Sequence, residues 1–332
     1  MYATAEGTAR YEARFPQFRE NAFFRSVLNL SVSSLGIGTF LGKPDDETDR
    51  AYTDALIAAG ENGINFFDTA INYRNQRSER CIGAALKQLQ RDEIVVCTKA
   101  GFLTQGAVPP SMTAEDVVGG MHSMAPDFLA DQIDRSRENL GVDTIDVFYL
   151  HNPETQFGFV NLEEFETRIR HAFARLEQLV DREKIRWYGT ATWDGYRKKG
   201  ALNLPRLVEL AQEVAGADHH FRFVQLPFNI GMVEAFVEKP ESVLQAAARL
   251  GVVVVASATL QQAQVIAQMP KTVAERLPDL DTNAQRAIQF TRSTPGIAAA
   301  LAGMSRREHV LENLGVAKVP PIALEPYLRL YQ

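Results

Sequence analysis

The sequence predicts a single (β/α)8 barrel, and three observations support this prediction. Short apolar segments typical of strands occur eight times along the 332 residues. Each segment is followed by a stretch with the apolar periodicity of a helix, so strands and helices alternate along the chain. The strand segments are apolar on both faces, as in a parallel sheet that is covered on both sides. Eight such units favour a closed barrel over an open sheet.

Each predicted strand is followed directly by a polar or small residue. They span residues 34–38, 64–67, 94–97, 145–150, 185–189, 221–224, 252–256 and 297–301. The helix candidates between them span residues 49–62, 78–90, 128–140, 164–183, 204–214, 241–250 and 283–292, and a further short one spans 307–314.

Two other segments have a predicted place in the barrel. Residues 24–32 alternate apolar and polar side chains around Asn29, which predicts a short hairpin that plugs one end of the barrel. We therefore divide the chain into an N-terminal extension, residues 1–23, and one barrel domain, residues 24–332. The longest connection, residues 101–126, follows the third strand, and a loop of this length is usually a binding loop or a lid.

Composition excludes several classes of function. The chain carries 35 Lys and Arg against 41 Asp and Glu, a net charge of −6 without a long single-sign block, which argues against nucleic-acid and polybasic membrane contacts. The only cysteines, Cys81 and Cys97, do not form a disulfide framework. No metal-ligand spacing, targeting segment or membrane-spanning run occurs, so we expect a soluble cytoplasmic protein without a metal site. The oligomeric state stays open.

Reactive groups of a (β/α)8 barrel lie where its strands end, and polar residues stand at these positions here. Asp68 follows the second predicted strand, Lys99 the third and His151 the fourth, and Tyr73 comes five residues after Asp68. A neighbouring ammonium stabilises a tyrosinate and lowers the pKa of the phenol. The four residues therefore form a candidate proton-transfer set with Tyr73 as the donor.

These residues lie in motifs that resemble the aldo-keto reductase family over nearly the whole chain. The motifs are GINFFDTA at 63–70, Tyr73 with RSE at 77–79 and Gly83, VCTK at 96–99, and FYLH at 148–151. The resemblance implies hydride transfer from a nicotinamide cofactor, usually NADPH, to an aldehyde or ketone. It makes Tyr73 the general acid, Lys99 the group that lowers its pKa, Asp68 the partner of Lys99, and His151 the residue that orients and polarises the carbonyl.

The resemblance also implies a site for the nicotinamide. The family places a Ser-Asn pair after its fifth strand, where this chain has Ala191 and Thr192, and of these only Thr192 can form a side-chain hydrogen bond. Gln225 matches the glutamine of the family that contacts the carboxamide. Many members have a stacking tyrosine after the seventh strand, where this chain has Ser257, and Leu260 follows in the same loop.

The C-terminal region resembles the segment that binds the adenosine half of the cofactor. Ser305, Arg306, Arg307 and Asn313 follow the eighth strand, and arginines beside a helix N-terminus suit a phosphate. We expect NADPH as cofactor, and NADH is not excluded. No GxGxxG fingerprint follows a strand, which argues against a Rossmann domain.

Two further residues are candidate contacts of a small carbonyl substrate. Trp193 lies at the predicted rim, where it is also a candidate to stack on the nicotinamide, and His122 lies on the long loop. Two alternative functions stay open at this point. One is a dinucleotide-binding sensor or accessory subunit with little turnover, suggested by the missing Ser-Asn pair and tyrosine. The other is a lyase in which Lys99 forms a Schiff base.

Overall fold

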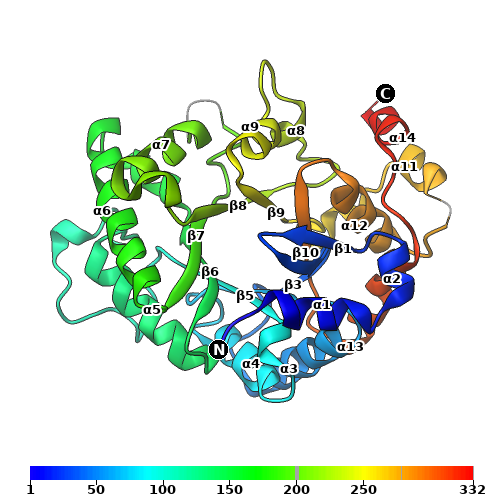
Figure 1. Cartoon of the computed structure of the whole chain (residues 1–332), viewed down its shortest axis with the longest axis horizontal. Coiled ribbons are helices and arrows are strands. Elements are labelled where there is room, and N and C mark those ends of the chain that lie inside the picture. Colours follow the sequence, from blue (N-terminus) through cyan, green and yellow to red (C-terminus); the bar gives the residue numbers. More distant parts are fainter. Residues whose placement is uncertain (199–201, 278, 332) are drawn as a thin grey trace.

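The computed structural model describes residues 1–198, 202–277 and 279–331, and it confirms the predicted barrel. Eight parallel strands close in the order β10-β3-β4-β5-β6-β7-β8-β9 (Figure 1). Their bounds are β3 Leu35–Gly38, β4 Phe66–Asp68, β5 Val95–Ala100, β6 Ile145–His151, β7 Ile185–Ala191, β8 Phe221–Pro227, β9 Val253–Ser257 and β10 Ile297–Gly303. All but β3 extend beyond the predicted run at its C-terminal end, because the polar residues there still take part in the strand ladder.

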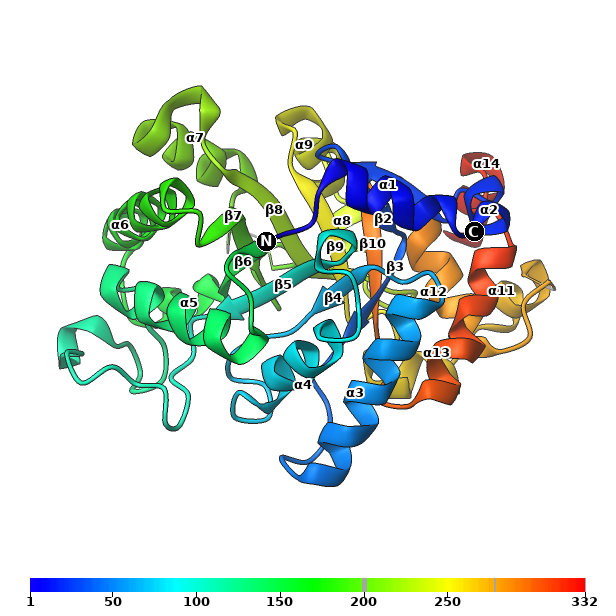
Figure 2. The ribbon, with the colours of Figure 1, turned by 60° about the horizontal axis from the view of Figure 1, so that its bottom comes forward.

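The helices surround the strands, and Figure 2 shows α3 to α6 side by side on the outside of the barrel. Each predicted helix is present with ends shifted by a few residues, the largest shift being at α4, which ends at Leu86 rather than residue 90. Local signals set several ends: the Asp45 carboxylate accepts the N–H of Thr48 at the start of α3, and Gly141 adopts a left-handed conformation after α5. The eight helices are α3 Asp46–Glu61, α4 Arg77–Leu86, α5 Pro126–Leu140, α6 Leu162–Asp181, α7 Leu204–Ala215, α9 Val243–Leu250, α12 Asn283–Ser293 and α13 Arg307–Asn313.

The predicted hairpin is present as β1 (Phe24–Val27) and β2 (Leu30–Ser33). Leu28 and Asn29 both have positive φ, as a two-residue hairpin turn requires. Val27, Leu30 and Val32 pack on side chains inside the barrel, and the Asn65 amide donates to the carbonyl of Ser31 at 2.8 Å. The hairpin therefore closes the N-terminal end of the barrel (Figure 1). Two helices that the sequence analysis did not predict, α1 (Ala5–Ala13) and α2 (Pro16–Glu20), precede it.

Short helices occupy the remaining connections and the C-terminus. The described residues include α8 Glu234–Val237, α10 Gln264–Ala267, α11 Lys271–Arg276 and α14 Leu324–Leu328. None of the described helices is long and apolar enough to cross a membrane. Within the same residues, no group of three or more His, Cys, Asp or Glu side chains is arranged to hold a metal ion.

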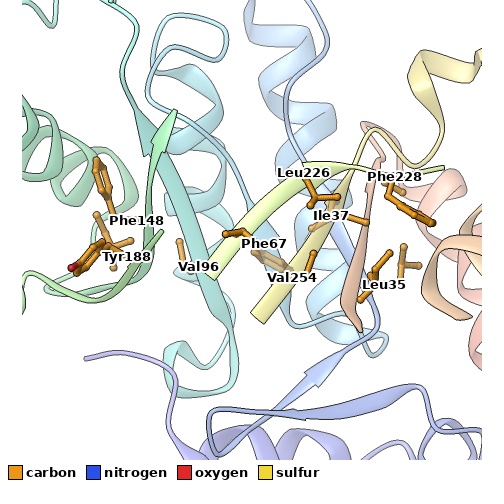
Figure 3. Close-up of a cluster of buried hydrophobic side chains, with 14 of the residues drawn as sticks. Leu35, Ile37, Phe67, Val96, Phe148, Tyr188, Leu226, Phe228 and Val254 are labelled. Carbon is orange, nitrogen blue, oxygen red and sulfur yellow. The ribbon is translucent and has the colours of Figure 1, made fainter. Parts of the chain in front are cut away.

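Alternation along the strands separates two layers of the core. Outward-facing side chains such as Phe67, Val96 and Phe148 pack beneath the helices (Figure 3). Their neighbours Phe66 and Val95 face inward and pack inside the barrel. Because successive side chains of a strand point to opposite faces, the same alternation decides which polar residues at the strand ends point into the barrel.

Candidate active site

Four polar side chains complete the barrel interior at the C-terminal ends of its strands. Asp68 is two residues after the inward-facing Phe66 on β4, and Lys99 and His151 end the inward rows of β5 and β6 in the same way. Gln225 follows the inward-facing Phe223 on β8. The period of two therefore collects side chains that are far apart in the sequence into one layer.

Lys99 and Asp68 form a buried ion pair in this layer. The Lys99 Nζ donates to Asp68 Oδ1 at 2.6 Å and to the carbonyl of Thr69 at 2.7 Å. The Gln225 amide donates to the second carboxylate oxygen of Asp68 at 2.8 Å. Burial lowers the pKa of Lys99, but Asp68 and Tyr73 together raise it by more, so the pKa lies above its ordinary value. Lys99 is therefore an ion-paired ammonium group rather than a free amine nucleophile.

Tyr73 lies in the loop between β4 and α4 and faces this ion pair. Its ring centroid is 5.1 Å from the Lys99 Nζ, and its ring packs edge-on against Phe40 at 4.9 Å and against His151 at 5.8 Å. The phenol, the imidazole and the ammonium thus meet at one point, as the sequence analysis expected.

The pKa of Tyr73 differs from that expectation. Burial raises the pKa of the phenol, and this effect outweighs the opposing effect of the Lys99 charge, so the pKa lies above 10 rather than near neutrality. The Asp68 carboxylate raises it further and also neutralises much of the Lys99 charge. Tyr73 is consequently a phenol that stays protonated over the whole neutral range.

Arg74 holds the loop that carries Tyr73. Its buried guanidinium pairs with Asp49 and donates to the carbonyl of Lys43 at 2.9 Å. The backbone has positive φ at Arg74, Asn75 and Gln76, a conformation that residues other than glycine rarely adopt. The ion pair ties this turn to the first turn of α3, and the hydrogen bond to Lys43 ties it to the connection between β3 and α3, which also carries Phe40.

His151 is neutral because burial, and then the charge of Lys99, hold its pKa well below the ordinary value. Its Nδ1 is buried without a hydrogen-bonding partner among the described residues. The Phe102 ring, from the start of the long loop, packs edge-on against the imidazole at 5.2 Å. A neutral imidazole in this position can hydrogen-bond to a ligand without carrying a charge.

The expected substrate contact of His122 is not what the structure shows. The His122 side chain is fully buried, its Nε2 lies 2.8 Å from the carbonyl oxygen of His151, and its Nδ1 lies 2.9 Å from the Gln156 amide. Burial lowers the pKa of His122 to about 4. The ring packs against the strand end that carries His151 and does not line the cavity above it.

A cavity of about 760 Å³ opens above Asp68, Tyr73 and His151. Its volume falls in the range of small-molecule sites, roughly 300 to 1,000 Å³. The cavity runs from these residues to the loop that follows β10. Of the residues expected from the sequence, those that line it are Thr192, Trp193, Gln225, Ser257, Leu260, Ser305 and Asn313.

Arg306 and Arg307 do not line this cavity. Both side chains are exposed at the start of α13, next to Ser305, which does line it. The backbone places them at the rim, beside the wall residue Ser305.

Several wall residues were missed by the sequence analysis. Phe40 and Phe102 come two residues after the ends of β3 and β5, so the strand-end rule that selected Asp68 applies to them as well. The residues 261–264 that follow β9 carried no such signal, and Gln261, Gln262 and Ala263 there have positive φ. A run of strained backbone is typical of a ligand-binding site.

The two cysteines have no place in this chemistry. Cys81 and Cys97 are free and buried, and burial raises the pKa of each thiol. Neither lines the cavity above Asp68.

The model of the aldo/keto reductase family matches residues 34–326. A NADH-specific methylglyoxal reductase of Escherichia coli is 30% identical over 188 residues, 53% of this chain and 55% of that protein, so the match spans about half of the relative. A probable voltage-gated potassium channel subunit beta of Arabidopsis thaliana is 22% identical over 88% of this chain and 90% of its own length.

Solved structures share the fold. An aldo/keto reductase of Klebsiella pneumoniae, in complex with NADP and acetate, superposes with a TM-score of 0.68 at 18% identity, covering 92% of this chain and 93% of its own. At this level of identity the likeness concerns the arrangement of the backbone.

Proposed function

Because the chain belongs to the aldo/keto reductase family, we propose that it reduces the carbonyl group of a small aldehyde or ketone to an alcohol with a nicotinamide cofactor. The observation that supports the proposal most directly is the meeting of Tyr73 and His151 at the floor of one cavity, with the Lys99–Asp68 pair behind them. This arrangement offers a proton and a neutral hydrogen-bonding group to the same ligand atom.

The cavity wall fits a nicotinamide dinucleotide. Buried polar atoms of Thr259 and Asn313, both in the wall, have no hydrogen-bonding partner among the described residues and are available to a polar ligand. Thr192 and Gln225 would hold the nicotinamide end, Ser257 and Leu260 the middle, and Ser305 and Asn313 the adenosine end. Arg306 and Arg307 stand at the rim, within the neighbourhood of a phosphate bound at Ser305.

NADPH is the cofactor that we propose, and NADH is a second possibility. The Klebsiella structure contains NADP, whereas the E. coli relative is named as NADH-specific. When bound, the reduced nicotinamide supplies the hydride.

The residues of the chain supply the proton and the orientation. Tyr73, protonated at neutral pH, donates its phenolic proton to the oxygen of the carbonyl group as that oxygen gains negative charge. The Lys99 ammonium then stabilises the tyrosinate that remains. His151, held neutral, hydrogen-bonds to the same oxygen and orients the carbonyl. Asp68 keeps Lys99 in place and charged.

Two residues of the cavity wall favour a second candidate function, that of a dinucleotide-binding subunit with little turnover. Ala191 has no side-chain hydrogen-bonding group, and Ser257 offers no ring to stack on a nicotinamide. The Arabidopsis relative is named as a channel subunit. We favour the reductase because all four residues of the proton-transfer set are present: Asp68, Tyr73 and His151 line one cavity, and Lys99 is paired with Asp68 beneath it.

Titration calorimetry with NADPH and with NADH, followed by a carbonyl screen, tests the proposal. Binding with turnover supports the reductase. Binding without turnover of any carbonyl, in the wild-type protein and under saturating cofactor, would favour the second candidate. Absence of binding of both dinucleotides would overturn both.

A further inference from the structure

A half-buried glutamate outside the proton-transfer set contacts a segment that lines the cavity. Glu154 is three residues after His151, in the 3-10 helix Pro153–Gly158, where a left-handed Asn152 turns the chain at the end of β6. It does not line the cavity, and its Oε2 is buried without a hydrogen-bonding partner among the described residues. The mechanism above assigns it no role.

The other oxygen of Glu154 binds three consecutive backbone N–H groups. Its Oε1 accepts from Trp193 at 2.8 Å, from Asp194 at 3.0 Å and from Gly195 at 3.2 Å. Hydrogen bonds to an ionised acceptor are about twice as strong as those between neutral groups. Burial raises the pKa of Glu154, and the three N–H groups oppose this effect. The carboxylate therefore fixes the backbone of the segment that follows β7, residues 192–196.

This segment carries one wall of the cavity. Trp193 is 46% exposed although it is large and apolar, and it lines the cavity. A second bond fixes the far end of the segment, where the Tyr196 hydroxyl lies 2.7 Å from the Thr190 hydroxyl. The first half of the segment depends on Glu154, because the backbone of residues 193–195 has its N–H groups on this one oxygen.

We propose that Glu154 is a positioning residue that sets the substrate specificity of the site by fixing the Trp193 indole as a wall of the cavity. The inference rests on the proposed carbonyl reduction for its kinetic test but not for its spectroscopic test. Substrates large enough to reach the indole depend on Glu154, whereas small carbonyl compounds that only reach Tyr73 and His151 do not.

Removal of the carboxylate leaves three N–H groups without an acceptor, so residues 193–195 rearrange. In Glu154→Ala, the KM for 4-nitrobenzaldehyde is expected to rise about tenfold or more, with a much smaller change in the KM for propanal. Glu154→Gln keeps an acceptor oxygen of the same reach without the charge and is expected to lie between Glu154→Ala and the wild type. Glu163→Gln, at an exposed acidic residue at the start of α6, is the matched control.

A double-mutant cycle tells whether Glu154 acts through Trp193. Trp193→Ala is expected to reproduce the rise in KM for 4-nitrobenzaldehyde, and adding Glu154→Ala to it is expected to change KM less than twofold more, because coupled residues are not additive. If the two effects multiply, Glu154 acts by another route and the inference is wrong.

Fluorescence tests the same point without any turnover. The chain has two tryptophans, so in a Trp187→Phe background all indole emission comes from Trp193. Glu154→Ala in this background is expected to shift the emission to longer wavelength and to increase quenching by acrylamide, with Glu154→Gln intermediate and Glu163→Gln unchanged. Circular dichroism checks that each variant is folded, and if Glu154→Ala is not, Glu154→Gln carries the test.

The outcomes separate the two proposals. If the wild type reduces neither aldehyde with NADPH or NADH, the proposed function fails, and the emission and quenching still decide the role of Glu154. If the aldehydes are reduced but Trp193 emission, quenching and KM are the same in Glu154→Ala and the wild type, the inference fails and the proposed function stands.

Discussion

The Lys99 ammonium lies 2.6 Å from the Asp68 carboxylate and 5.1 Å from the centre of the Tyr73 ring. The Lys99 ammonium therefore pairs with a buried carboxylate and also faces the phenol that we propose as the acid. Burial raises the pKa of the phenol by more than the Lys99 charge lowers it, and the Asp68 carboxylate raises it further, so the pKa lies above its ordinary value.

Replacement of Tyr73 by Phe removes the proton and leaves the ring. We expect kcat for carbonyl reduction to fall by about 10²- to 10⁴-fold, because general acid catalysis contributes an effect of this size. Calorimetry is expected to give nearly unchanged dinucleotide binding. Near-normal turnover of Tyr73→Phe would exclude Tyr73 as the acid.

Lys99→Met removes the charge that lowers the pKa of Tyr73. The pH at which reduction declines is expected to move to still higher values, and the reaction is expected to slow because the tyrosinate loses its counter-ion. The variant also leaves Asp68 buried without its partner, which costs about 3 kcal/mol of stability or more. Rate–pH profiles of the wild type and the variant that coincide would contradict this role.

His122 makes the stability of the fold depend on pH. Its pKa is about 4 in the fold against an ordinary 6.5, so between these values the unfolded chain binds a proton that the folded chain does not. Stability is therefore present above pH 6.5 and lost as pH falls toward 4, by roughly 3 kcal/mol in total. Urea unfolding at several pH values is expected to give a smaller loss for His122→Gln than for the wild type. Parallel curves for the two proteins would refute the prediction.

Arg74 is expected to matter for catalysis although it does not line the cavity. Arg74→Met breaks the ion pair with Asp49 and the bond to the carbonyl of Lys43, which frees the loop of Tyr73. We expect kcat to fall about tenfold, with partial recovery in Arg74→Lys. The control is Asn75→Gly, which relaxes the neighbouring positive φ and keeps both contacts of Arg74. This variant should retain full activity. Equal kcat in Arg74→Met and the wild type would contradict the role of Arg74 in holding the loop of Tyr73.

Gly189 on β7 has no room for a side chain. A Cβ there would lie 1.8 Å from the carbonyl oxygen of Phe223 on the neighbouring strand, so the backbone itself would have to move. Gly189→Ala is expected to destabilise the protein by about 3 kcal/mol or more in thermal or urea unfolding. Gly158→Ala, where a Cβ meets no atom within 4 Å, is expected to change stability little. A similar stability of both variants would contradict the packing argument.

The sequence by itself determined the fold class and the proton-transfer set. Parallel strands that are buried on both faces appear in the sequence as continuous apolar runs. The polar residues at the ends of these runs, such as Asp68 and His151, are therefore easy to recognise. The same rule applied to the neighbouring connections would also have found Phe40 and Phe102. The placement of Ser305 and Asn313 in the cavity wall followed from motif likeness.

Only the tertiary structure decided the environment of these residues. Burial, which depends on all neighbouring elements at once, set the pKa of Tyr73 above 10 and withdrew His122 from the cavity. Contacts between residues far apart in the sequence decided the rest: Arg74 with Asp49, and Glu154 with the backbone of Trp193. Local periodicity records which face of an element is buried, but it carries no information on which distant backbone or side-chain group lies against that face.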